Sequence, residues 1–294
     1  MRARNFIVLG VALAAGALLA SCGVGGIGGG ESQGQINDDL GILTANYVIV
    51  DLDSGALDTA TALSDVATNV SYRTSKMVFR AVPAGTATTG AVPGTFGAQS
   101  DELPVTASHS KYFIAVFEVT QAQWTRIAGS GSTPWTVAGV AAVAGSAVGD
   151  SMPAYGVSRD AVDAALLAAT GRWSFSFGLP SAQQWEVACR GGTSTVYSWG
   201  DLGATPATTA TAYARVAETA QGTSGPEDVG SKTPNALGLY DMHGNVWEWT
   251  AGGTGTIRGG SWCDSLSMAR SANLQDLDRA VPHALVGARL ILVP

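Results

Sequence analysis

Cysteine, histidine and charged residues are scarce in this chain of 294 residues. It has three cysteines and three histidines, and charged residues make up 13% of it. His109, His243 and His283 stand in separate segments, so none has metal-ligand spacing to another and an iron centre is not expected. Acidic residues outnumber basic ones by 23 to 16, which gives a net charge of −7. Nucleic-acid binding needs basic patches, so nucleic acid is not an expected partner.

The start of the chain has the pattern of a secretory signal. Arg2 and Arg4 precede an apolar run from Phe6 to Leu19, which is too short to predict a membrane span. The residues Leu19-Ala20-Ser21-Cys22 match a bacterial lipobox, which predicts cleavage before Cys22 and a lipid on its sulfur. The alternative is an ordinary cleaved signal. Residues 1–21 are therefore interpreted as a lipoprotein signal peptide, and the Gly-rich residues 22–45 as a flexible tether.

Two further cysteines, Cys189 and Cys263, allow one bridge at most. Secretion favours a disulfide. However, Cys189 lies on the apolar side of a predicted helix, where a buried free thiol is common. Both possibilities stay open.

Residues 46–294 are predicted to form one α+β domain rich in irregular loops, because 46% hydrophobic residues suffice for a core. Short apolar runs predict strands at 47–52, 77–82 and 111–119. Long loops are expected at about 85–104 and 194–233.

Three polar residues mark expected helix starts. Ser158 can cap a helix that runs to Thr170 and ends at Gly171. Ser181 can cap a second helix to Cys189, and Thr120 a third to about Ile127. The spacing of Ala, Leu and Val predicts a weaker helix from Asp58 to Ala67.

The most informative tract runs from Pro234 to Thr250 and contains two acidic residues, a glycine turn and two tryptophans. The tract, with Arg258-Gly-Gly-Ser-Trp262 after it, resembles the signature of the formylglycine-generating enzyme (sulfatase-modifying factor) family. Three further segments resemble family motifs in the same order, at 112–120, 178–192 and 287–293. The resemblance implies the C-type lectin-like fold of that family. It does not by itself imply the activity, because one fold hosts many functions.

The family oxidises a substrate cysteine with a pair of cysteines that capture copper, shortly after the Gly-Gly-Ser motif. The corresponding positions here are Asp264 and Ala269, while Cys263 is one residue too early and has no partner nearby. A single thiolate is a poor copper site. We therefore expect no copper and no enzyme activity. The alternative is a formylglycine-generating-type oxidase.

The resemblance also implies a calcium site in the same tract. The family's ligand positions correspond to Asp241, Gly244, Val246 and Glu248, and two carboxylates with carbonyls between them suit Ca²⁺. The alternative is that Asp241 and Glu248 only hold loop amides. The family's other calcium site is expected to be lost, since Arg215 stands where an asparagine would lie.

The aromatic residues Trp199, Trp247, Trp249 and Trp262 are candidates for an aromatic floor, although Trp commonly packs in cores. Trp247 and Trp185 are therefore interpreted as structural. Arg258 and Arg289 are expected to brace the last segment through buried ion pairs.

The segment after Trp262 has no helical or strand period. Its mixed polar and apolar residues lie between two family-like anchors, which is similar to the variable lipoproteins of diversity-generating retroelements, the treponemal variable protein among them. Residues 247–294 are thus the candidate variable segment, and we expect one exposed ligand-binding surface that comprises Trp249, Trp262, Cys263, Asp264, Ser265, Leu266, Ser267, Asn273, Leu274, Asp276, Asp278 and His283.

These features predict a non-catalytic, monomeric lipoprotein on the outer surface of a bacterial envelope. It would bind an unknown protein or surface ligand and reach the membrane through its lipid. The alternative to display is an accessory lipoprotein of the same fold with an invariant structural role.

Overall fold

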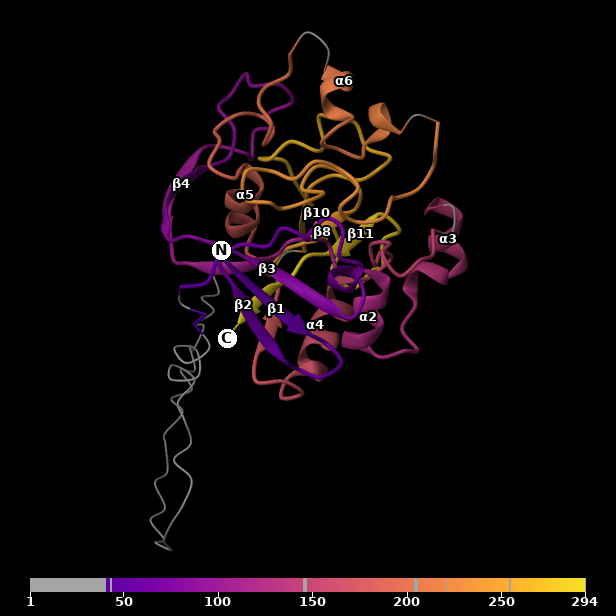
Figure 1. The fold of residues 1–294 in the computed structure, drawn as a ribbon. Coiled ribbons are helices and arrows are strands. Elements are labelled where there is room, and N and C mark those ends of the chain that lie inside the picture. The colour runs from indigo at the N-terminus through magenta and orange to yellow at the C-terminus, as the bar shows by residue number, and fades with distance from the viewer. Residues whose placement is uncertain are drawn as a thin grey trace, which may run out of the picture.

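A computed structural model describes residues 41–42, 44–144, 147–203, 206–220, 222–253 and 255–293 (Figure 1). The expected signal peptide, Cys22 and most of the expected tether lie outside these residues. Within the described part of the chain, no helix is both long and apolar enough to cross a membrane.

A six-stranded antiparallel sheet forms the centre of the fold, in the order β2-β1-β3-β6-β12-β7. Its strands are β1 (Tyr47–Asp51), β2 (Leu57–Ala60), β3 (Lys76–Val82), β6 (Tyr112–Ala115), β7 (Ser176–Gly178) and β12 (Ile291–Val293). The register pairs β1 with β3 from Tyr47↔Arg80 to Asp51↔Lys76. The last strand of the chain therefore closes the sheet between β6 and β7.

Side chains of this sheet alternate between two cores, because successive residues of a strand point to opposite faces. Val48, Phe79 and Phe113 enter one core, and Ile49, Val78 and Ile114 enter the other. The first core includes residues of α2 (Gln121–Ala128) and α4 (Arg159–Ala169). The second includes residues of α5 (Ala182–Arg190). Helices therefore contribute to the cores on both faces of the sheet.

Two smaller sheets complete the strand structure. A four-stranded sheet has the order β10-β9-β8-β11 and comprises β8 (Trp247–Trp249), β9 (Thr256–Arg258), β10 (Leu274–Asp276) and β11 (Val286–Ala288). A two-stranded ribbon pairs β4 (Gly85–Thr89) with β5 (Val105–His109). The remaining helices are α3 (Ala138–Ala144), α6 (Pro206–Ala210) and the 3₁₀ turns η1 (Val70–Arg73), η2 (Pro134–Thr136) and η3 (Ala217–Thr219).

The helix starts predicted from capping residues are confirmed. The side chains of Thr120, Ser158 and Ser181 each accept a hydrogen bond from the backbone N–H three residues later. Two predictions in the first third of the fold are wrong. The expected helix at 58–67 begins instead as β2, whose residues pair with β1, and the expected loop from 85 begins as β4, which pairs with β5.

Candidate functional site: the Trp247–Trp249 strand and the segment after it

The strand β8 lies in the interior of the small sheet and holds the signature tract rigidly. It pairs with β11 in parallel, Trp247↔Val286 to Trp249↔Ala288, and with β9 on its other side. The turn before it contains two non-glycine residues with positive φ, Asp241 (57°) and Asn245 (62°). At Gly244 (φ 94°), a Cβ would lie 2.0 Å from the carbonyl oxygen of Arg215, so only glycine fits.

A buried ion pair anchors β8 to the end of the chain. Arg289 donates to both carboxylate oxygens of Glu248, at 2.7–3.1 Å, and neither side chain is more than 1% exposed. Glu248 also accepts a hydrogen bond from Nε1 of Trp185. Arg289 further donates to the carbonyls of Ala115, Val116 and Tyr240. The expected bracing role of Arg289 is confirmed.

Arg258 holds the segment after β9 against α5 through a second buried ion pair. Its Nη1 lies 3.1 Å from Oε2 of Glu186 and donates 2.8 Å to the carbonyl of Ala272. The other oxygen of Glu186 pairs with Arg190 at 2.8 Å. One carboxylate of α5 thus serves two guanidinium groups.

Two further carboxylates are buried near Glu248. Glu118 accepts hydrogen bonds from Asn245 Nδ2 and the Val246 N–H, and Asp241 accepts one from the Gly230 N–H. Burial and the neighbouring carboxylates raise the pKa of Glu118 well above its ordinary value. Burial also raises the pKa of Asp241, to about 6. Glu118 was not among the predicted site residues, although an acid inside the apolar run 112–119 could have indicated a buried partner.

The structure divides the predicted ligand-binding residues into three groups. Those that are exposed are Cys263, Ser265, Asp276 and Asp278. Those that are half-buried are Trp262, Asp264, Ser267, Leu274 and His283. Those that are buried are Trp249, Leu266 and Asn273.

The predicted exposure of the buried three is therefore wrong, and each has a specific partner. Trp249 donates from Nε1 to the carbonyl of Val157. Leu266 packs in a cluster that includes Tyr197 and Val216. Asn273 donates to the carbonyl of Met268 and accepts from Gln99.

The expected aromatic floor does not form as one platform. Trp199 stacks on Tyr197, with ring centroids 4.5 Å apart, and on Tyr213 at 5.2 Å. Trp249 is fully buried. Trp247 and Trp185 are buried as expected.

The positions that correspond to the family's two thiols carry other chemistry. Asp264 accepts hydrogen bonds from Nε1 of Trp247 and from the N–H and hydroxyl of Ser261. Ala269 is buried against Gly260. These residues offer no pair of thiolates, so the donor set does not fit copper.

Both described cysteines are free, Cys189 in the core and Cys263 at the surface. Sγ of Cys189 lies 3.6 Å from Nε2 of His243, which resembles a nucleophile and base pair. However, burial raises the pKa of Cys189 to about 12 and lowers the pKa of His243 to about 4. Both groups are neutral at physiological pH, so this pair carries no thiolate.

Alkylation should distinguish the two thiols. A chain with Cys22→Ser, treated with iodoacetamide at pH 8 while folded, is expected to gain one label, on Cys263. The thiolate is the nucleophile, and the pKa of about 12 leaves roughly one part in ten thousand of Cys189 ionised. Peptide mass spectrometry locates the label, and unfolding in guanidinium should expose the second thiol. Equal labelling of both thiols in the folded chain would contradict the burial of Cys189.

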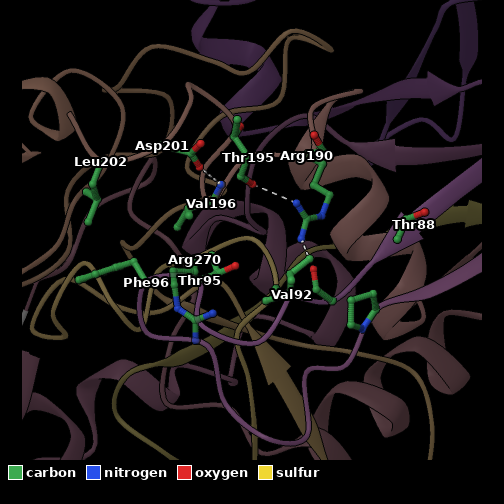
Figure 2. A pocket seen from close by; sticks show the side chains of 15 residues that line it. Thr88, Val92, Thr95, Phe96, Arg190, Thr195, Val196, Asp201, Leu202 and Arg270 are labelled. Atoms are coloured by element: carbon green, nitrogen blue, oxygen red, sulfur yellow. Dashed lines mark hydrogen bonds between the residues drawn. The ribbon is translucent and has the colours of Figure 1, made fainter.

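A cavity of about 440 Å³ lies outside the predicted surface (Figure 2). Its walls come from residues 88–104, residues 190–202 and the pair Arg270 and Ala272. None of the twelve predicted ligand-binding residues lines it.

A family model matches most of this chain, whereas individual relatives align with about a quarter to a third of it. The model of the "Sulfatase-modifying factor enzyme 1-like domain" matches residues 63–293. The chain is 43% identical to the formylglycine-generating enzyme of Mycobacterium tuberculosis over 77 residues, which are 24% of this chain and 26% of that enzyme. It is 36% identical to the inactive C-alpha-formylglycine-generating enzyme 2 of Bos taurus over 98 residues, 30% of this chain and 33% of that protein. The alignments thus span about a quarter to a third of these relatives.

Two solved structures share the fold. Treponema denticola variable protein 1 superposes with a TM-score of 0.62 at 21% identity, over 74% of this chain and 96% of that chain. PvdO from Pseudomonas aeruginosa superposes with a TM-score of 0.63 at 20% identity, over 74% and 94%. At these identities the likeness is one of fold alone.

Proposed function

The chain belongs to the family of sulfatase-modifying factor enzyme 1-like domains, and from this premise we propose that it is a non-catalytic, lipid-anchored surface protein that displays a ligand-binding surface. The observation that carries the proposal is the pair Asp264 and Ala269 at the family's thiol positions. Asp264 is engaged by Trp247 and Ser261, so this position holds the backbone in place. The family's members include proteins named as inactive, which agrees with a role other than oxidation.

The display surface that we propose contains fewer residues than the set predicted from the sequence. It comprises the exposed and half-buried members of the predicted set, which alternate with buried anchors such as Leu266 and Asn273. A rigid frame that carries exposed positions is suited to exchanging side chains without loss of fold. The name "variable protein" is that of the treponemal neighbour. That the display positions of this chain vary in sequence between copies of the gene is our proposal.

Randomised display tests the proposal. A library randomised at Cys263, Ser265, Asp276 and Asp278 is selected against lysozyme and streptavidin. A control library is randomised at the exposed residues Thr61, Ala62, Ser64 and Ala67. We expect binders from the first library more often than from the second. Equal yields from both libraries would contradict a dedicated display surface.

The alternative of a formylglycine-generating-type oxidase rests on the family's named enzymes. The alternative of an accessory lipoprotein with an invariant role rests on the same fold. The first predicts copper-dependent oxidation, and the second predicts that the two libraries behave alike.

Calcium at Asp241 is a further part of the proposal. The buried carboxyl groups of Glu118, Asp241 and Glu248 all interact electrostatically with the buried guanidinium of Arg289, and a bound cation would favour their ionised forms. Calcium would be held by Asp241 and the carbonyls of Gly244 and Val246, with Glu248 as the remaining ligand. The engagement of Glu248 by Arg289 and Trp185 favours the bracing alternative for that residue.

Chelation tests this site directly. If calcium binds, EGTA should lower the melting temperature and added calcium should restore it, because a ligand that prefers the folded state stabilises it. Asp241→Asn keeps the acceptor for the Gly230 N–H and removes the charge, so it should abolish the response without unfolding the domain. A melting curve that EGTA leaves unchanged would assign the carboxylates to loop bracing alone.

Anchoring at Cys22 gives a separate prediction. The protein expressed with its own signal should partition into the detergent phase of Triton X-114, and Cys22→Ser should move it to the aqueous phase. Acyl chains supply the membrane affinity, and stable attachment needs more than one chain. Metabolic labelling with a fatty acid identifies the modification. Wild-type protein found in the aqueous phase would contradict lipid anchoring at Cys22.

A further inference from the structure

A third buried guanidinium lies beside the signature tract, apart from those of Arg258 and Arg289. Arg215 is 2% exposed. A charge in the protein interior must be paired and hydrogen-bonded, because its transfer out of water is costly. The groups around Arg215 therefore show what its charge does.

The partners of this guanidinium come from one short loop. Nε and Nη2 donate to the carbonyl of Gly225 at 3.3 and 2.8 Å, and Nη2 also donates to the carbonyl of Thr223 at 3.0 Å. Oε1 of Glu227 lies 3.3 Å from Nε. Two carbonyls and one carboxylate within residues 223–227 thus converge on a single cation.

Glu227 has a second partner on its other oxygen. Oε2 lies 3.2 Å from Nζ of Lys232 and accepts a hydrogen bond from the hydroxyl of Ser231. Lys232 therefore pairs with the carboxylate from the side of Oε2. Arg215 connects Oε1 to the carbonyl oxygens of the loop.

The oxygens around Arg215 are of the kind that calcium binds. Ca²⁺ takes carbonyl and carboxylate oxygens as ligands, and the resemblance described above implies an asparagine ligand at position 215. Arginine instead has five N–H donors and no acceptor, and its charge repels another cation. Calcium therefore does not fit the residues present at this point.

The loop that Arg215 holds contacts the signature tract. The Glu227 N–H donates to Oδ1 of Asn245 at 2.9 Å, and the Gly230 N–H donates to Oδ2 of Asp241 at 2.6 Å. The backbone of Arg215 is fixed to the same tract, because the Asn245 N–H donates to its carbonyl at 2.8 Å. Arg215 thus joins the loop to the tract, its side chain on one and its backbone on the other.

We infer that the guanidinium of Arg215 takes the place of a calcium ion. It is a cation that belongs to the chain itself, and it holds residues 223–227 against the signature tract without metal. This part of the fold therefore keeps its structure when free calcium is low. The inference goes beyond the display function and does not depend on the calcium proposed at Asp241.

Hydrogen exchange of the Glu227 amide measures whether the loop is held. All proteins carry Asp241→Asn, so that the calcium site proposed there does not contribute. With Arg215 in place, the amide should exchange at the same rate in EGTA and in millimolar calcium. Slower exchange in calcium would mean that a metal holds the loop, and would overturn the inference.

Removing the guanidinium is the second arm. Arg215→Gln should speed exchange of the Glu227 amide at least tenfold, because it removes the charge on which the three oxygens converge. Arg172→Gln is the matched control, since the exposed Arg172 also donates to two carbonyls, those of Arg126 and Ile127. It should leave the Glu227 amide unchanged. Exchange in Arg215→Gln as slow as with Arg215 in place would overturn the inference.

Arg215→Asn tests the replacement itself. Asparagine ends one bond short of the position of Nε, which leaves room for an ion between its oxygen and the carbonyls. Millimolar calcium should therefore slow exchange of the Glu227 amide in this variant at least tenfold relative to EGTA. If Arg215→Gln fails to fold, Arg215→Asn in calcium still gives this result. A Glu227 amide that calcium does not protect in Arg215→Asn would make Arg215 an ordinary brace, and would overturn the inference.

Discussion

Replacing Arg289 by methionine should lower the free energy of unfolding by about 3–5 kcal/mol, because it leaves a buried carboxylate without its cation. Glu248 is 1% exposed, so water cannot solvate its charge once the guanidinium is gone. The carbonyls of Ala115, Val116 and Tyr240 lose a donor at the same time. Urea denaturation followed by tryptophan fluorescence measures the loss.

Two control variants show whether burial causes the effect. Arg279→Met breaks ion pairs with Asp160 and Asp163 but removes a side chain that is 39% exposed, so it should lower the stability far less than Arg289→Met, because solvent screens exposed ion pairs. The double variant Arg289→Met with Glu248→Gln should be more stable than Arg289→Met alone, since it removes the unpaired charge. If Arg289→Met costs no more than Arg279→Met, the ion pair does not anchor the fold.

The second large effect separates the anchors from the display positions. Leu266→Ala should cost about 2–5 kcal/mol, the usual range for a buried leucine, because Leu266 is 5% exposed within its cluster. Replacing Cys263, Ser265, Asp276 and Asp278 together by alanine should cost under about 2 kcal/mol, at roughly 0.5 kcal/mol for each surface change. Thermal unfolding of both variants against wild type makes the comparison.

The informative result is which of these two variants unfolds at the lower temperature. A fourfold surface variant that unfolds before Leu266→Ala would mean that the exposed positions are part of the structural frame. A Leu266→Ala variant as stable as wild type would mean that Leu266 is not a structural anchor and can belong to the display surface.

Local signals accounted for much of the fold. Thr120, Ser158 and Ser181 each mark a helix start by a side chain that accepts a backbone N–H three residues on, and this chemistry lies within a few residues of sequence. The strand β2 was missed because its partner β1, and not the spacing of Ala and Leu in residues 58–67, decides its conformation. Pairing with β5, some 20 residues away, likewise turns Gly85–Thr89 into a strand.

The site was predicted less well than the fold, because burial in an aperiodic segment depends on distant contacts. Leu266 is buried by Tyr197 and Val216, and Asn273 is hydrogen-bonded by Gln99. No pattern within residues 263–283 indicates these partners. The bracing arginines, in contrast, were predictable, because a conformationally irregular tract with acidic residues needs cations to pair with.

The most direct measurement of the central claim is an oxidation assay on copper-treated protein. The chain is incubated with Cu(I), oxygen and a cysteine-containing peptide of a sulfatase, and mass spectrometry follows conversion of the thiol to an aldehyde. The formylglycine-generating enzyme of Mycobacterium tuberculosis serves as the positive control. We expect no aldehyde above the level of copper alone, because Asp264 and Ala269 replace the thiol pair. Copper-dependent aldehyde formation that is lost in Cys263→Ser would contradict a non-catalytic display scaffold.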